Sequence, residues 1–146
     1  QCLRDNGWEL ASHSWGHINF GKRSFEDVKT DSDKWASRVE SLIGKTDILL
    51  YPFGSDVGDW HPYTMENEKY AYLHELGFRY FCNVDSSQYW VQFGSDYLRQ
   101  GRRNLDGYRM YYDLPETNPE KDHLSDLFDV TQVFDRERPV PVAPMN

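Results

Sequence analysis

The sequence contains little cysteine, no long apolar run and few basic residues for its length. Two cysteines among 146 residues are too few for a four-cysteine zinc knuckle or a disulfide-stabilised scaffold, although a single disulfide between Cys2 and Cys82 stays open. No stretch approaches the roughly 20 consecutive apolar residues that a membrane-spanning helix needs. Sixteen Lys and Arg against 24 Asp and Glu give a net charge of -8. Nucleic-acid-binding proteins concentrate positive charge, so the sequence predicts neither a membrane span nor a nucleic-acid partner.

Aromatic residues, in contrast, are plentiful. They make up 16% of the chain, with ten tyrosines and five tryptophans. Aromatic faces can stack on sugar rings, but most aromatic side chains simply fill protein cores. The chain is long enough for a domain with a substantial hydrophobic core.

Two histidines, His13 and His17, stand four positions apart, directly after a short strand-like run. On one helical turn, residues four apart share a face, so both rings could reach one metal ion. Neutral imidazole is a good ligand for zinc and similar divalent metals, and two nitrogens leave room for a carboxylate and an activated water. The pair therefore predicts half of a hydrolytic metal site. The alternative is two surface histidines that are merely close in the sequence.

A second candidate segment is Tyr51-Pro52-Phe53-Gly54, which follows a short apolar run. Pro and Gly occur in ordinary loops, so one interpretation is a strand-to-loop turn and the other is the wall of a binding groove. Leu50 alternates with Tyr51 along the strand and is expected to face the core. The polar loop that follows holds Asp56, Asp59, Trp60 and His61, which could contact a ligand or only water.

These segments carry a family resemblance. Residues 7–17, reading Gly-Trp-Glu-Leu-Ala-Ser-His-Ser-Trp-Gly-His, resemble the histidine motif of the polysaccharide deacetylases (NodB-homology, carbohydrate esterase family four). The Tyr51-Pro52-Phe53-Gly54 segment looks like a variant of that family's third motif, with Leu50 and Tyr51 where an arginine is commoner. Looser similarity extends over residues 73–81, 84–87, 102–107 and 126–130.

The resemblance implies metal-dependent deacetylation of N-acetylated sugars in a cell-wall or extracellular polysaccharide by the intact protein. It implies a divalent metal, with zinc expected, held by His13 and His17, and a substrate groove formed by Tyr51, Pro52, Phe53 and Gly54. The expected partner is a polysaccharide or an N-acetylated sugar oligomer, and the expected location is extracellular or in the cell envelope. The alternative is a carbohydrate-binding or structural module that keeps the fold without turnover.

Part of the family pattern has no match in this chain. Family members carry a Thr-Phe-Asp-Asp segment upstream of the histidines, which supplies the catalytic base and the third metal ligand. Only six residues precede Gly7, so we expect residues 1–139 to be the C-terminal portion of a longer domain, followed by an extended Pro-rich tail at 140–146. Asp85, at the end of a predicted strand, is the internal candidate for the base. By itself, the chain is expected not to catalyse deacetylation.

Helix and strand signals alternate along the chain, which predicts an α/β architecture with parallel strands. Ser24 is expected to cap a short helix, and a second helix is expected from about Asp33 to Gly44. The other predicted elements are a strand at 48–50, a helix at 66–76, a strand at 78–84 and candidate strands at 89–93 and 108–112. The resemblance implies a distorted (β/α) barrel that lacks its first strand. A second copy of the chain, or its own tail, would then cover the exposed sheet edge.

Overall fold

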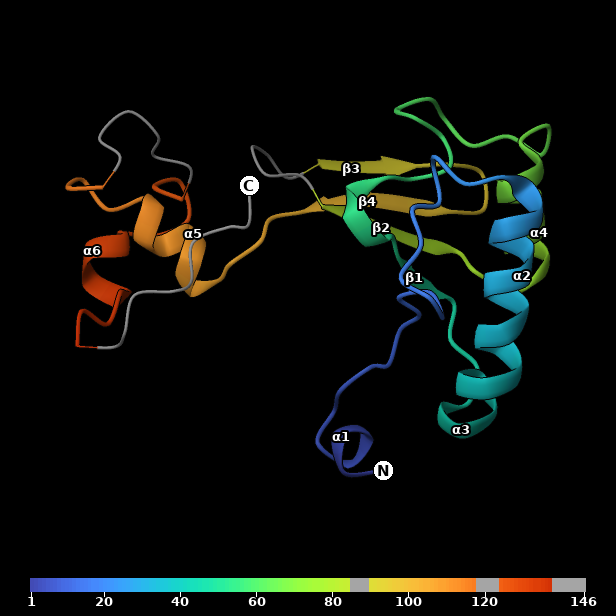
Figure 1. Cartoon of the computed structure of the whole chain (residues 1–146), viewed down its shortest axis with the longest axis horizontal. Helices are drawn as coiled ribbons and strands as arrows, with labels where there is room; N and C mark the ends of the chain where they lie inside the picture. Colours follow the sequence, from blue (N-terminus) through green and yellow to red (C-terminus); the bar gives the residue numbers. More distant parts are fainter. Residues whose placement is uncertain (85–89, 118–123, 138–146) are drawn as a thin grey trace. The chain divides into compact units, whose positions relative to one another are not determined.

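The computed structural model describes residues 1–84, 90–117 and 124–137. The chain divides into two compact units, Gln1–Arg102 and Arg103–Asn146, which are treated separately below (Figure 1). The Pro-rich tail predicted at 140–146 lies outside the described residues. No described helix combines the length and apolar character that crossing a bilayer requires.

The first unit is built on a four-stranded mixed sheet in the order β1-β2-β4-β3. The strands are β1 (Ile48–Leu50), β2 (Tyr80–Val84), β3 (Trp90–Phe93) and β4 (Leu98–Arg102). β2 is parallel to β1 and to β4, whereas β3 is antiparallel to β4. The predicted α/β class and parallel pairing are confirmed. The sheet formed by the described residues is open, and a closed (β/α) barrel stays a prediction.

A continuous helical segment precedes β1. α2 (Phe25–Trp35) passes directly into a π-helical turn, η1 (Ala36–Glu40), and then into α3 (Ser41–Ile43). The cap is confirmed, because the Ser24 hydroxyl accepts a hydrogen bond from the Asp27 amide at 3.1 Å. The separate second helix expected from Asp33 is wrong, since no break separates it from the first.

The π-helical turn also changes which side chains face the core. Trp35 is buried, and Val39 and Ile43 pack against the core, but Leu42 is 83% exposed. The spacing of Val39, Leu42 and Ile43 predicts one apolar stripe at 3.6 residues per turn, and Leu42 leaves that stripe because the i→i+5 turn rotates the residues that follow it. The segment ends at Gly44, as predicted, with a φ of +77° that favours glycine.

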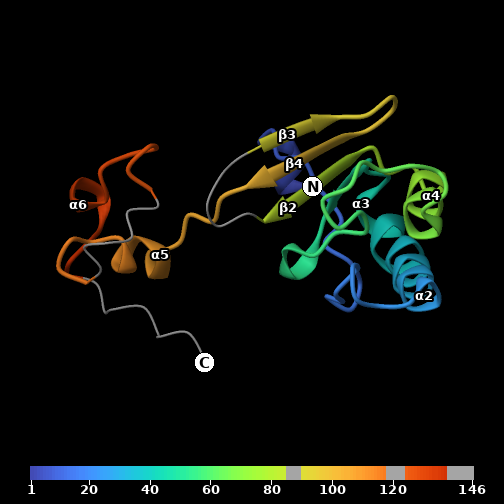
Figure 2. The same cartoon turned by 90° about the horizontal axis from the view of Figure 1, so that it is seen from above.

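One face of the sheet packs against α2 and α4 (Glu68–Glu75), which lie beside each other (Figures 1 and 2). The core joins Leu49 and Phe81 of the sheet to Val28 of α2 and to Tyr70 and Leu73 of α4. The helix predicted at 66–76 and the strands predicted at 78–84 and 89–93 are therefore confirmed, each with shorter bounds. β4 is missed by the sequence pattern, because four of its five residues are polar or glycine.

The first unit also contains a short helix, α1 (Cys2–Asp5). Both cysteines are free thiols, Cys2 exposed and Cys82 buried in β2, so the disulfide left open by the sequence is not formed in this structure. Burial raises the pKa of the Cys82 thiol.

The second unit contains α5 (Gly107–Tyr112) and α6 (Val130–Val133). A small core of Leu114, Leu124 and Val130 lies within this unit. The candidate strand at 108–112 is wrong, and the reason is a helix cap. The Asp106 carboxylate accepts a hydrogen bond from the Arg109 amide at 2.7 Å, which favours a helical start over an extended chain.

Candidate functional site

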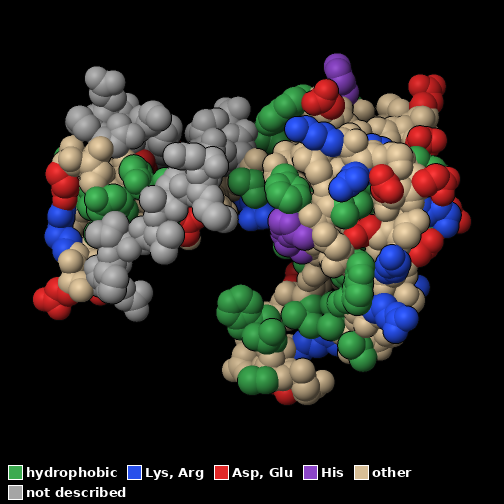
Figure 3. All heavy atoms as spheres, viewed as in Figure 1, with side chains coloured by type: hydrophobic (Ala, Val, Ile, Leu, Met, Phe, Trp, Pro, Cys, Tyr) green, Lys and Arg blue, Asp and Glu red, His purple; other side chains and the backbone are tan. Residues whose placement is uncertain are grey.

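His13 and His17 are both exposed side chains of the first unit. Figure 3 shows where histidine side chains reach the surface on one face of that unit. The ring centroids of His13 and His17 are 4.9 Å apart. The helical turn that the spacing suggested is wrong, since residues 13–17 form an irregular loop. Ser14 and His17 adopt the left-handed backbone conformation, with φ of +64° and +49°. Two such residues fold the loop back on itself, and this brings the two rings together.

Hydrogen bonds hold the histidine loop to the rest of the first unit at its start and in its middle. At its start, Ser12 pairs with the edge of β1: its amide donates to the Ile48 carbonyl at 2.9 Å, and its carbonyl accepts from the Leu50 amide at 2.7 Å. In its middle, the buried Asp31 carboxylate of α2 accepts from the amides of Trp15 and Gly16, at 2.9 and 2.6 Å. The loop therefore has a defined conformation although it contains no regular secondary structure.

One hydrogen bond sets the tautomer that His13 adopts when its ring is neutral. Its Nδ1 lies 2.8 Å from the carbonyl oxygen of Leu50. A carbonyl oxygen can only accept, so Nδ1 carries the proton and the neutral ring keeps its lone pair on Nε2. This is the arrangement found in metal-binding histidines, whose second nitrogen donates to a carbonyl or carboxylate. His13 is thus prepared to act as a ligand through Nε2.

The Tyr51-Pro52-Phe53-Gly54 segment divides between core and surface. Phe53 is 67% exposed, and its ring centroid lies 4.7 Å from that of His17. The Phe53 ring therefore lies next to the histidine pair. Tyr51 and Pro52 are buried, so their side chains do not present a groove surface. The expected orientation of Leu50 is also wrong, because Leu49 and Tyr51 face the helix-covered core and Leu50 faces the opposite side of the sheet.

Gly54 has a specific steric role in this segment. Its φ is +61°, and a side-chain carbon at this position would lie 2.8 Å from the carbonyl oxygen of Val84. Only glycine allows the chain after β1 to pass this close to the end of β2. The segment therefore lies where parallel strands end, which is the usual place for ligand sites in open α/β sheets.

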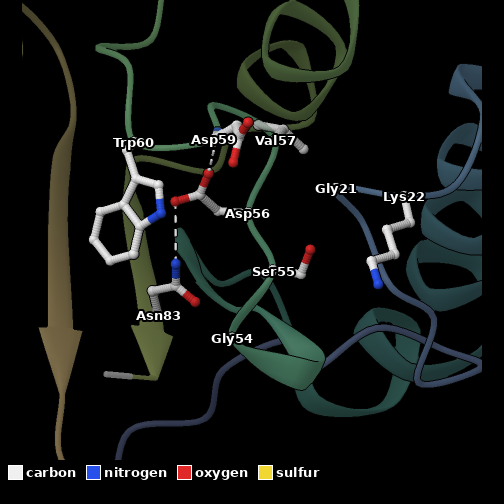
Figure 4. Close-up of a pocket in the computed structure, with 9 residues that line it drawn as sticks. All are labelled: Gly21, Lys22, Gly54, Ser55, Asp56, Val57, Asp59, Trp60 and Asn83. Atoms are coloured by element: carbon white, nitrogen blue, oxygen red, sulfur yellow. Dashed lines mark hydrogen bonds between the residues drawn. The ribbon is translucent and has the colours of Figure 1, made fainter. Parts of the chain in front are cut away.

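Beyond Gly54, the chain borders a pocket of about 350 Å³ (Figure 4). Its polar lining includes Lys22, Ser55, Asp59 and Asn83, and Trp60 lies at its side. Three of the four loop residues that the sequence left open, Asp56, Asp59 and Trp60, thus line the pocket. Lys22 and Asn83 were not anticipated, because nothing in the linear pattern distinguishes them from other surface or strand residues.

A buried ion pair between Asp56 and Arg99 holds the loop that lines the pocket. The carboxylate of Asp56 pairs with the guanidinium of Arg99, and both side chains are only 2% exposed. The same carboxylate accepts hydrogen bonds from the Asn83 amide at 3.1 Å and from the backbone amides of Gly58 and Asp59 at 2.7 and 2.9 Å. Arg99 also donates to the His61 carbonyl at 2.9 Å. Asp56 is therefore a structural anchor for the loop and is not available to a ligand.

A complete metal-ligand set is not found among the described residues, where no three His, Cys, Asp or Glu side chains come together in a way that could hold an ion. The carboxylate of Asp31, which holds the histidine loop, accepts hydrogen bonds from two backbone amides. Asp85, the internal candidate for a base, lies outside the described residues. The two histidines fit a metal as a partial site that a further ligand would complete.

Comparison with known proteins adds no relative, since no family model, curated protein or solved structure matches this chain.

Proposed function

We propose that the intact protein is a metal-dependent deacetylase of N-acetylated sugars in a cell-wall or extracellular polysaccharide. The observation that supports this most directly is the hydrogen bond between the Nδ1 of His13 and the Leu50 carbonyl, which in the neutral ring puts the lone pair that can coordinate on Nε2. The ring of His17 lies beside it at 4.9 Å. Imidazole pairs of this kind suit zinc and other divalent ions.

Within this proposal, the residues of the chain have separate roles. His13 and His17 hold the ion, and the exposed ring of Phe53 forms an apolar wall next to His17. When bound, a divalent ion supplies a Lewis acid for the acetamide carbonyl and lowers the pKa of a coordinated water toward about 7. A third protein ligand and an aspartate base complete the proposed site from residues outside this histidine loop.

Zinc titration by calorimetry tests the metal site directly. We expect the intact protein to bind one zinc ion, and we expect His13→Ala and His17→Ala each to weaken binding strongly because each removes one of the few protein ligands. His61→Ala is the matched control, since His61 is also an exposed histidine but lies outside the pair. Unchanged stoichiometry and affinity in both loop variants would contradict the proposal.

A second candidate function is carbohydrate binding without turnover. The observation that favours it is the pocket beside Trp60, which is formed without any contribution from the histidines. A module of this kind would bind sugar with or without zinc. Sugar binding that persists in a chain with no zinc affinity would favour this candidate over the deacetylase.

A further inference from the structure

We infer that Trp60 and the adjoining pocket form a subsite for one uncharged sugar ring, with the ring stacked on the exposed indole and its hydroxyl groups directed at the polar lining. The inference rests on the proposed function for the class of ligand, a carbohydrate. It does not depend on a metal or on turnover.

The indole of Trp60 is linked to the core by a series of ring contacts. Its centroid lies 5.9 Å from that of Trp90, and the two ring planes are inclined at 53°. The guanidinium of Arg99 lies 5.3 Å from the Trp90 ring and 4.8 Å from the Tyr63 ring. Because Arg99 is held by the buried carboxylate of Asp56, these contacts are anchored in the core. Trp60 is thus a supported surface, and a ligand that stacks on it does not need to order it first.

The backbone around Trp60 is held in an unfavourable conformation. Asp59 and Trp60 have consecutive positive φ values, +44° and +71°, which cost energy for residues with side chains. The turn persists because the Asp56 carboxylate binds the amides of Gly58 and Asp59. This turn leaves Trp60 65% exposed, although an indole of this size would gain free energy by burial.

The charges of the pocket favour an uncharged ligand. The carboxylate of Asp56 is neutralised by Arg99, which leaves Lys22 and Asp59 as one positive and one negative group in the lining. Ser55 and Asn83 add a hydroxyl and an amide. A mixture of donors and acceptors with no net charge suits the hydroxyl groups of a sugar better than a phosphate. The indole supplies the apolar face that one side of a pyranose ring requires.

Binding of an N-acetylglucosamine tetramer, measured by calorimetry without metal, tests the subsite. We expect Trp60→Ala to weaken binding roughly tenfold, the scale of one lost aromatic contact. Trp8→Ala is the matched control, because Trp8 is also 65% exposed but does not line the pocket. Equal effects of the two substitutions, or no binding by the unmodified chain, would overturn the inference.

Asp59→Asn provides a second variant that keeps the fold, since asparagine tolerates a positive φ and the amide that Asp56 binds belongs to the backbone. It should weaken tetramer binding severalfold. Inorganic phosphate should not compete with the sugar, and competition would refute an uncharged ligand. The two proposals can fail separately. Sugar binding without any zinc affinity would contradict the deacetylase proposal but support the subsite. Zinc binding without sugar affinity would contradict the subsite alone.

Discussion

At the scale of single residues, the Asp56–Arg99 pair decides how the pocket is built. Two opposite charges buried at 2% exposure cost desolvation energy, and the cost is recovered only when every partner is in place. Here the carboxylate also accepts from Asn83 and from two backbone amides. The pair therefore links the loop after β1, the end of β2 and β4 in one network.

Replacing Asp56 with Asn should lower the free energy of unfolding by about 3–5 kcal/mol, because Arg99 would become a buried charge without its counterion. Urea denaturation measures this change. Asp33→Asn is the control, since Asp33 forms an exposed pair with Lys29 at 2.8 Å and exposed pairs contribute little. A loss of similar size in both variants would show that the buried pair has no special role.

At the scale of elements, the histidine loop depends on a helix that contributes no candidate ligand. α2 carries Asp31, whose buried carboxylate holds the amides of Trp15 and Gly16 between the two histidines. The loop includes left-handed residues that would otherwise favour other conformations. Helix α2 therefore positions the proposed metal ligands through a single side chain.

Asp31→Ala should weaken zinc binding up to about tenfold without removing a ligand, as is typical when a group that orients the ligands is lost. The circular dichroism of the variant should stay that of the parent, because α2 keeps its cap and its apolar face. Asp27→Ala, on the exposed side of the first turn of α2, should leave zinc affinity unchanged. Full zinc affinity in Asp31→Ala would mean that the loop holds its shape unaided.

At the scale of the whole first unit, tyrosines form much of the core between sheet and helices. Tyr51 and Tyr63 are both buried, and the Tyr63 hydroxyl donates to that of Tyr51 at 3.2 Å. Burial is the main cause that raises the pKa of each phenol well above its usual value. Both hydroxyl groups thus keep their protons in the folded state under alkaline conditions that ionise an exposed tyrosine.

The free energy of unfolding should therefore fall as the pH rises above about 10, the ordinary pKa of tyrosine. Below that pH both phenols are protonated in the folded and unfolded states, so their contribution is complete; above it the unfolded chain releases protons that the folded chain retains. Denaturant unfolding at a series of pH values measures the slope. Tyr63→Phe should make it shallower, and phenolate absorbance from these residues before the loss of helix signal would contradict the argument.

The sequence by itself determined the elements whose causes are local. Ser24 and Gly44 mark the start and the end of the helical segment, although the sequence divided it into two helices. The apolar run at 48–50 is a strand, and the α/β class follows from alternating signals. Local patterns failed where a distant partner or an irregular turn intervened. A π-helical turn moved Leu42 to the surface, and a capping aspartate turned 108–112 into a helix.

Only the tertiary structure decided the site. The histidines meet through a loop held by Asp31, and the ring of Tyr51 packs against those of Phe20 and Phe81. The pocket depends on Asp56 binding an arginine 43 positions away. Such contacts leave no periodic signal, because they join side chains from elements far apart in the chain. Arg99, one of two arginines in the polar strand β4, is unremarkable in the sequence. It becomes the centre of the network only when the sheet places it beneath the loop, where a buried charge requires a partner.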